Sequence, residues 1–209
     1  MHVHTSRHSP DSVINPFALV RRAGELGLTG VVITEHDWLW TEAELDELRA
    51  ATPLVQVYAG IEVSAAEGHF LCYGVYDPMR LPKGIPLKDL CREVHAQGGA
   101  VFAAHPYRWG QDFDSIMNQE PLLDGLEVMS SNMDDHCRTK ARACWSDHPA
   151  PWAALGNSDA HVIEKVANCY SVFPHAIRDQ TDLLEALRNG QVEARARYFA
   201  SEDVWEETN

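Results

Sequence analysis

An alternation between strand-like and helix-like stretches is the feature that most constrains the fold of this 209-residue chain. Short apolar runs, such as 30–34 and 100–104, are typical of buried strands. Helix starts lie between them, for example Asn15-Pro16 and the capping pair Thr41 and Glu44. This alternation favours a mainly parallel sheet covered by helices. We therefore predict a small βα barrel, with an open doubly wound sheet as the alternative.

The element boundaries follow from the same patterns and from glycine and proline breaks. The predicted strands cover residues 1–4, 30–34, 54–63, 68–75, 100–104, 125–129, 152–155 and 168–173. The predicted helices cover residues 16–26, 42–51, 86–97, 135–146 and 181–188. Strands 54–63 and 68–75 are close enough to pair as a hairpin. Without repeats or linkers, residues 1–209 are expected to form one domain, and the last ten or so residues a peripheral acidic tail.

The charge balance limits the partners that this chain can bind. It has 31 acidic and 17 basic residues, for a net charge of −14. Binding to long duplex nucleic acid depends on neutralisation of phosphates by Lys and Arg, so long nucleic acid is not expected as the main partner. A small anionic substrate remains compatible, because bound divalent cations would reverse the local field.

Cysteine usage and hydropathy indicate the compartment. The five cysteines are odd in number and form no C-x-x-C pair, which is typical of reduced thiols. No apolar run approaches the ~18 residues of a membrane span, and the polar start lacks a signal-peptide core. We expect a cytoplasmic protein without a membrane partner.

Histidines and acids directly follow the carboxyl ends of separate predicted strands. They are His36, Glu62, His105, Asp159 and His161. In βα barrels this end carries the active site, because the loops after the strands converge there. Histidines scattered over a surface would have no reason to favour one end of every strand. The pattern therefore predicts a shared site at the mouth of the barrel.

Two pairs of candidate ligands are spaced two residues apart, namely His2 with His4 and Asp159 with His161. On an extended strand, residues i and i+2 project from the same face, so each pair offers two donors side by side. A nitrogen and oxygen set without cysteine suits Zn, Mn or Fe. A carboxylate such as Glu62 can bridge two ions about 3.5–4 Å apart, as in hydrolysis at phosphorus.

Several of these side chains also have structural interpretations. His36 can belong to an ordinary solvated loop, His69 can be a satisfied core histidine, and His105-Pro106 can be a turn. Tyr107 and Trp109, which flank Arg108, can line a pocket mouth or pack in the core. The other histidines lack matching partners and are interpreted as structural or surface residues: His95, His136, His148 and His175.

Six motifs in chain order resemble the PHP (polymerase and histidinol phosphatase) domain family. They are His2-Val3-His4-Thr5, Ile33-Thr34-Glu35-His36-Asp37, Gly60-Ile61-Glu62-Val63-Ser64, Gly68-His69, Ala104-His105-Pro106 and Asn157-Ser158-Asp159-Ala160-His161. The match spans residues 2–161. The later part is similar to small stand-alone members through Leu183, Leu184, Ala186, Leu187 and Gly190. The resemblance implies a distorted (β/α)7 TIM-like barrel that holds two to three divalent metal ions, Zn, Mn or Fe.

The resemblance also implies which residues hold the ions. The ligands would be His2, His4, Glu62 and Asp159 for the first ion, Glu62, His69 and His105 for the second, and His36, His161 and one residue of the first loop for the third. For that loop residue we favour Asp11, which lies seven residues after His4 and five before Pro16, as the family's loop acid does. His8 is the alternative, because some members use histidine in this loop.

Two positions depart from the family pattern. The family usually has Asp before the first histidine pair and a longer first strand, whereas this sequence starts at Met1. A misassigned start or a trimmed first strand is expected, and either would loosen the first metal site. Glu35 replaces the usual Asp before His36. Because that position normally supports a ligand from behind, a modest effect on ligand orientation is expected.

These inferences predict a metal-dependent phosphoesterase that hydrolyses a small phosphorylated substrate with a metal-activated hydroxide. Glu62, Asp159 and His161 are the predicted catalytic residues, and Arg108 is the predicted cation for substrate oxygens. One alternative is a nuclease for short oligonucleotides. Another is a metal-binding regulatory module without turnover. The sequence predicts neither the identity of the substrate nor the oligomeric state.

Overall fold

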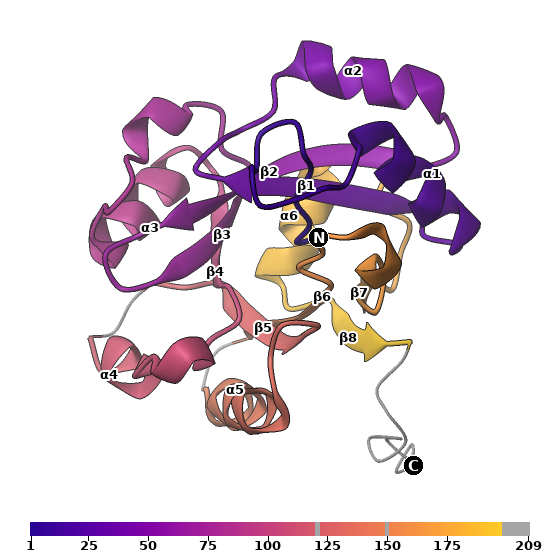
Figure 1. Cartoon of the computed structure of the whole chain (residues 1–209). Helices are drawn as coiled ribbons and strands as arrows, with labels where there is room; N and C mark the ends of the chain where they lie inside the picture. The colour runs from indigo at the N-terminus through magenta and orange to yellow at the C-terminus, as the bar shows by residue number, and fades with distance from the viewer. Residues whose placement is uncertain (120–121, 149–150, 198–209) are drawn as a thin grey trace.

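A curled six-stranded sheet organises the computed structural model, which describes residues 1–119, 122–148 and 151–197 (Figure 1). Its strands are, in spatial order, β1 (Gly30–His36), β2 (Gln56–Ser64), β3 (His69–Tyr73), β4 (Ala100–Ala103), β5 (Gly125–Ser130) and β6 (Ala153–Asn157). Strand β3 runs antiparallel to both neighbours, and the other pairs are parallel. The predicted hairpin is therefore confirmed, and it interrupts an otherwise parallel sheet.

The first residues of the chain connect the two ends of this sheet. The backbone N–H of Thr34 in β1 donates to the carbonyl of Val3 at 3.0 Å, and the N–H of His4 donates to the carbonyl of Ala160 at 3.1 Å. Val3 forms an isolated parallel bridge with Ala160. The predicted opening strand is thus reduced to one bridging residue. It lies between β1 and the segment after β6, which gives the distorted barrel rather than an open doubly wound sheet.

Helices cover the outside of the sheet and one end of the barrel. They are α1 (Pro16–Glu25), α2 (Glu42–Ala51), α3 (Leu87–Ala96), α4 (Phe113–Met117), α5 (Asp135–Asp147) and α6 (Gln180–Arg188). Figure 1 shows α1 and α2 over β1 and β2, and α6 behind the barrel. Leu183 and Leu187 of α6 pack with interior residues that include Leu71, Phe102 and Leu155. This apolar plug leaves the opposite end of the barrel for polar side chains.

Capping hydrogen bonds confirm two of the predicted helix starts, those of α1 and α2. The side chain of Asn15 accepts hydrogen bonds from the N–H groups of Phe17 and Ala18. Thr41 and Glu44 form the reciprocal capping box at the start of α2. Such caps satisfy N–H groups that have no partner within the helix. Short-range chemistry therefore fixed these boundaries.

A small antiparallel ribbon of β7 (Cys169–Val172) and β8 (Glu193–Ala196) packs beside β6. The hydroxyl of Ser171 donates to the carbonyl of Gly156 at 2.9 Å. A Cβ at Gly156 would lie 2.5 Å from the carbonyl oxygen of Tyr170, so only glycine allows this close approach. Strand β8 and helix α4 are elements that the sequence patterns did not predict.

The sequence predictions also concerned membrane spans, the cysteines and the acidic tail. Within the described part of the chain, no helix is long and apolar enough to cross a membrane. All five cysteines are free thiols. The predicted acidic tail falls on residues 198–209, outside the described residues.

Candidate metal centre

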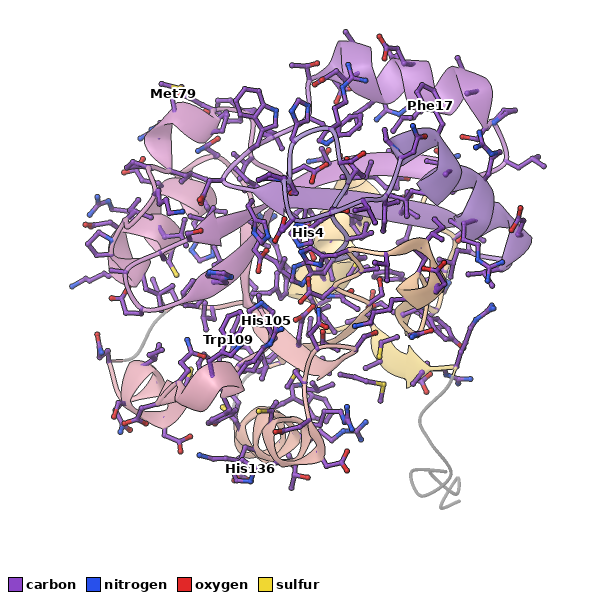
Figure 2. The ribbon with its side chains drawn as sticks, in the orientation of Figure 1. His4, Phe17, Met79, His105, Trp109 and His136 are labelled. Atoms are coloured by element: carbon purple, nitrogen blue, oxygen red, sulfur yellow. The ribbon has the colours of Figure 1, made fainter. Side chains whose placement is uncertain are left out.

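Histidines and acids from six segments converge at the barrel end opposite α6 (Figure 2). The N-terminal segment contributes His2 and His4, and the ends of β1 and β2 contribute His36 and Glu62. The start of β3, the residue pair after β4 and the loop after β6 contribute the others, His69, His105, Asp159 and His161. These are the residues that the sequence motifs pointed to.

The Glu62 carboxylate lies at the centre of the cluster and is 1% exposed. Its Oε2 is 3.3 Å from His2 Nε2, 3.2 Å from His4 Nε2 and 2.8 Å from His36 Nδ1. Its Oε1 is 3.1 Å from both His69 Nδ1 and His105 Nε2. Both oxygens of one buried carboxylate thus face imidazole nitrogens on two sides, which is the geometry of a bridging ligand.

Asp159 closes the cluster from the β6 side. Its Oδ1 is 3.3 Å from the Nε2 atoms of His2 and His4. The side-chain amide of Asn132 donates to Asp159 Oδ2 at 2.8 Å, and Arg108 Nη1 lies 3.5 Å from the same oxygen. Asp159 has a φ of +45°, a left-handed conformation that costs energy for a non-glycine residue. The backbone here is held in an unfavourable conformation that aims the carboxylate at the cluster.

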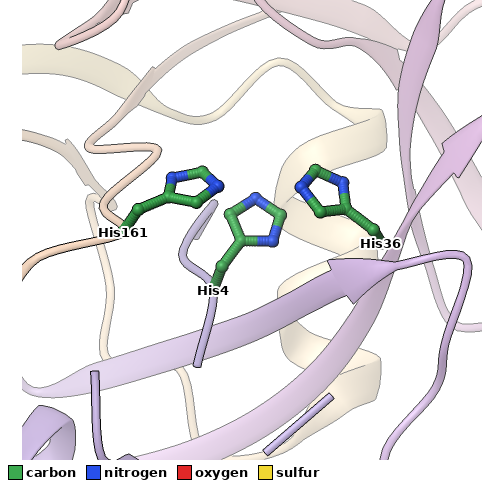
Figure 3. Close-up of side chains that lie close together, drawn as sticks. All are labelled: His4, His36 and His161. Carbon is green, nitrogen blue, oxygen red and sulfur yellow. The ribbon is translucent and has the colours of Figure 1, made fainter. Parts of the chain in front are cut away.

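A second group of donors lies nearer the solvent. The ring of His4 stacks between those of His36 and His161, with centroid distances of 4.2 and 4.3 Å (Figure 3). Asp11 Oδ2 is 3.1 Å from His36 Nε2 and 3.2 Å from His161 Nε2. The first loop therefore brings Asp11 to the two outer histidines.

His8, the alternative loop residue, points elsewhere. Its Nε2 is 2.9 Å from Glu44 Oε1, and its ring stacks on Trp38 with centroids 5.0 Å apart. His8 is therefore engaged at the start of α2 and on the neighbouring loop, while Asp11 takes the position beside the cluster.

Hydrogen bonds on the far side of two histidines determine which ring nitrogen faces the cluster. His2 Nδ1 is 2.9 Å from Glu127 Oε1. Because an ionised carboxylate oxygen can only accept a hydrogen bond, the ring nitrogen must be the donor. His4 Nδ1 is 3.2 Å from Ser9 Oγ, whose hydroxyl proton is donated to Glu35 at 2.6 Å. Both neutral rings then carry their proton on Nδ1, which leaves Nε2 as a lone-pair donor.

This arrangement fits a cation. The Nε2 atoms of His2 and His4 are 3.0 Å apart and both lie within 3.3 Å of oxygens of Glu62 and Asp159. Lone pairs and negative oxygens at such distances repel one another unless positive charge lies among them. Glu62 Oε2 is buried and accepts no hydrogen bond of good geometry from the described residues, although His36 Nδ1 lies 2.8 Å away. The donor set, imidazole and carboxylate without thiolate, suits Zn, Mn or Fe.

The pKa shifts show the same need for positive charge. Burial alone would lower the pKa of His2, but the carboxylates of Asp159, Glu127 and Glu62 raise it well above its usual value. Burial alone would raise the pKa of Glu62, but His2, His105 and His36 lower it well below the usual range. The raised pKa favours the protonated form of His2 in the absence of an ion, and a metal ion would have to displace that proton.

Among the described residues, four sets of donor atoms lie close enough to hold an ion, with all atoms of a set within 4.8 Å of one another. They are His4, His36 and His161; His2, Glu62 and His105; His2, His4 and Asp159; and His36, Glu62 and His69. Because the sets share members, they describe one multi-metal centre rather than separate sites. The geometry supports a multi-metal centre and leaves the identity of the ions open.

Glu127 is a buried acid of the centre that the sequence interpretation missed. It is fully buried in β5, where Oε1 contacts His2 and accepts from the side-chain amide of Asn157 at 2.9 Å. Its Oε2 accepts from the backbone N–H of His105 at 2.6 Å. A glutamate within the apolar strand 125–129 was the available signal, because a buried carboxylate needs partners.

Glu35 lies behind the ligands, where it was expected. It accepts hydrogen bonds from the N–H of Thr5 at 3.0 Å, from Ser9 Oγ at 2.6 Å and from Trp40 Nε1 at 2.9 Å. Ser9 in turn contacts His4. Glu35 thus orients a ligand through Ser9 and ties the first loop to β1.

A cavity of about 310 Å³ opens above the cluster. Arg108 and Trp109 line it from the loop after β4, and Lys165 lines it from the loop after β6. Among the described residues, Arg108 and Lys165 are the cationic side chains of its wall. Of the two aromatic neighbours of Arg108, Tyr107 is buried and packs against Phe113, whereas Trp109 lines the cavity.

The remaining histidines lie outside the cluster. His95, expected on the surface, is half-buried, with Nε2 2.8 Å from Asp124 Oδ2. About a third of its side chain stays exposed, and the contact forms because Asp124, which precedes β5, lies beside the end of α3. His136 is exposed on α5, His175 is exposed, and the ring of His148 stacks on Trp152.

Comparisons with known proteins agree with this geometry. Residues 150–192 match the PHP-associated family. An uncharacterised protein of Methanocaldococcus jannaschii is 28% identical over 142 residues, which cover 63% of this chain and 80% of that protein.

Solved structures share the fold. A two-domain protein from Bacteroides vulgatus, which contains a predicted PHP-like metal-dependent phosphoesterase, has a TM-score of 0.71 at 23% identity; the match covers 93% of this chain and 63% of that one. A proposed metal-dependent phosphoesterase from Bifidobacterium adolescentis has a TM-score of 0.62 at 20% identity, over 90% of this chain and 95% of that one. A lesion-specific endonuclease from Pyrococcus furiosus has a TM-score of 0.58 at 14% identity, over 93% and 56%. The chain thus spans less than two thirds of the first of these proteins.

Proposed function

Because residues 150–192 match the PHP-associated family and the chain shares the fold of PHP-like metal-dependent phosphoesterases, we propose that it hydrolyses phosphate esters of small molecules with the help of bound divalent metal ions. One observation carries the proposal. The Nε2 atoms of His2 and His4 lie 3.0 Å apart and face the carboxylates of Glu62 and Asp159, an arrangement that a bound cation would stabilise.

The residues have separate tasks in this proposal. The ions would be held by His2, His4, Asp11, His36, Glu62, His69, His105, Asp159 and His161. Bound divalent cations supply Lewis acidity, which makes water a stronger nucleophile near neutral pH and stabilises negative charge on phosphoryl oxygens. Glu62 and Asp159 keep their carboxylates ionised at neutral pH, because the surrounding imidazoles lower their pKa values despite burial. His161 stands at the solvent side, within reach of a substrate oxygen or the attacking water.

Arg108 would bind the phosphoryl oxygens. Its guanidinium lines the cavity and lies 3.5 Å from Asp159, so a phosphate placed at the cluster would meet a fixed positive group. Trp109 stacks on the guanidinium with 4.0 Å between Arg108 Cζ and the ring centroid, which restricts its motion. Lys165, which also lines the cavity, adds a second positive charge.

Metal removal and restoration test this function. The purified protein is stripped with a chelator, restored separately with Zn, Mn or Fe, and assayed on p-nitrophenyl phosphate, mononucleotides and oligonucleotides of graded length. We expect turnover of the small esters only after metal restoration. Equal turnover by the stripped protein would exclude a metal-dependent mechanism.

The same panel addresses a nuclease for short oligonucleotides, which is the second candidate. The endonuclease from Pyrococcus furiosus shares the fold, which supports this candidate, whereas the net charge of −14 counts against long substrates. Faster cleavage of oligonucleotides than of mononucleotides would favour the nuclease.

A further inference from the structure

The loop after β4 presents an unusual tryptophan to the candidate site. Trp109 is 74% exposed, although it lines the same cavity as Glu62 and Asp159. Its ring centroid is 5.5 Å from that of His105 and 6.1 Å from that of His69, in both cases edge-on. A large apolar ring thus lies next to the metal ligands with most of its surface free.

One face of this indole is already occupied. The guanidinium carbon of Arg108 lies 4.0 Å from the ring centroid, which places a cation over the ring. The two histidines contact the ring at interplanar angles of 66° and 78°, so they pack against it without covering a face. Because 74% of Trp109 is exposed and Arg108 covers one face, the opposite aromatic face is available to a flat group.

The loop holds this indole in a fixed position. His105, Tyr107 and Trp109 all have positive φ values, of 29°, 67° and 56°, which are unfavourable for residues with side chains. Bonds at both ends hold the loop in this conformation. The hydroxyl of Tyr107 donates to Asp114 at 2.6 Å, and the side chain of Gln111 donates to the carbonyl of Glu67 at 2.9 Å. A rigid aromatic platform loses little entropy when a ligand stacks on it.

From these contacts we propose that Trp109 selects phosphate esters whose leaving group carries an aromatic ring. The phosphate lies at the cluster and against Arg108, and the ring of the leaving group stacks on the free face of Trp109. The centroid distance of 5.5 Å between Trp109 and His105 places this platform about one ring away from the ligands. This inference rests on the proposed phosphoesterase function and adds the chemical class of its leaving group.

Two matched esters test the selection. Benzyl phosphate and cyclohexylmethyl phosphate both carry a six-membered ring and release a primary alcohol. Only the ring of benzyl alcohol has a π face. We expect kcat/KM of the metal-restored protein to favour benzyl phosphate by about three- to tenfold, the usual range for a stacked aromatic pair. In Trp109→Leu the ratio should fall to about one, whereas Trp109→Phe should keep part of it.

Trp38→Leu is the matched control, because Trp38 is also exposed, at 50%, but does not line the cavity. It should keep the full preference. Equal turnover of the two esters by the unaltered protein, or an unchanged ratio in Trp109→Leu, would overturn the inference. Thermal melting of each variant shows whether it is folded.

A binding measurement separates failure of this inference from failure of the proposed function. Calorimetry with benzylphosphonate and cyclohexylmethylphosphonate, which are not hydrolysed, is done on the metal-restored protein. Absence of turnover of every ester would contradict the phosphoesterase function, while tighter binding of benzylphosphonate that depends on Trp109 would still support the aromatic subsite. Equal affinities for the two phosphonates would overturn the subsite.

Discussion

The candidate metal centre has an inner and an outer half that are built differently. The inner half is His2, His4, Glu62 and Asp159, whose side chains are at most 3% exposed. The outer half is Asp11, His36 and His161, whose side chains are 54%, 27% and 26% exposed. Burial excludes water as a competing ligand and strengthens electrostatic interactions, so the inner half should retain cations more strongly.

The supports behind the ligands differ in the same way. In the inner half, His2 is anchored by the buried Glu127 and His4 by Ser9, which bonds Glu35. In the outer half, the Nδ1 atom of His161 lies 3.1 Å from the backbone carbonyl and 3.7 Å from Oδ1 of Asp159, which is itself a member of the cluster rather than a support behind it. Anchored ligands keep their geometry without the ion, whereas unanchored ligands must be ordered by it. We therefore expect the inner half to bind its ions more tightly than the outer half, although the two halves belong to one cluster.

Removal of the negative charge of Glu62 should have the largest effect, because this residue of the inner half also contacts His36 of the outer half. Glu62→Gln keeps the size of the side chain but loses the charge, so we expect activity to fall about 10³-fold or more and metal content to drop. Elemental analysis and the p-nitrophenyl phosphate assay measure this. Glu185→Gln, at an exposed position of α6, is the control. Full metal content with every activity unchanged would instead indicate a regulatory module without turnover.

Loss of the inner support comes next. Glu127→Gln replaces the carboxylate that holds the Nδ1 proton of His2, so the ring can turn its protonated nitrogen towards the cluster. We expect affinity for the most tightly held ions to fall about 10- to 100-fold, as is usual when a carboxylate behind a ligating histidine is removed. Competition with a chromogenic chelator measures this affinity. An affinity equal to that of the unaltered protein would show that Glu127 has only a packing role.

The outer half is tested by two variants of the first loop. Asp11→Asn removes the negative charge 3.1 Å from His36 and 3.2 Å from His161, so we expect loss of the weakest ion while the inner ions stay bound. His8→Gln should keep every ion, because His8 faces Glu44. Metal stoichiometry and titration of the stripped protein measure both variants. The reverse result would make His8 the ligand of the loop.

The smallest expected effect is a dependence of stability on pH that differs between the metal-free and the metal-restored protein. Without metal, the pKa of His2 is raised, so its stabilising contribution is complete below about pH 6.5 and is lost as the pH rises through the folded-state value. The melting temperature of the stripped protein should therefore fall from pH 6.5 upward. The metal-restored protein should show a growing advantage over the same range, because metal must displace that proton.

Differential scanning fluorimetry between pH 6 and 9, with chelator or with metal, measures both curves. His2→Gln is the control, since it removes the titrating group and should flatten the curve of the stripped protein. Parallel curves with and without metal would contradict displacement of a proton from His2.

The sequence by itself determined the local features. The capping residues Asn15, Thr41 and Glu44 set helix starts through bonds that span at most a few residues. The spacing of two between His2 and His4 placed both rings on the same side, because side chains of extended chain alternate. Residue type alone indicated a nitrogen and oxygen donor set. Each of these properties depends on neighbours along the chain, so a sequence pattern contains it.

Tertiary structure alone decided how the parts meet. The contacts of Asp11 with His36 and His161, the support of His2 by Glu127 and the bridge between Val3 and Ala160 all depend on closure of the barrel. His2 and Glu127 are 125 residues apart in sequence, yet their side chains are 2.9 Å apart. Contacts of this kind are set by strand order and sheet curvature, which arise from packing of the whole chain, and no local spacing encodes them.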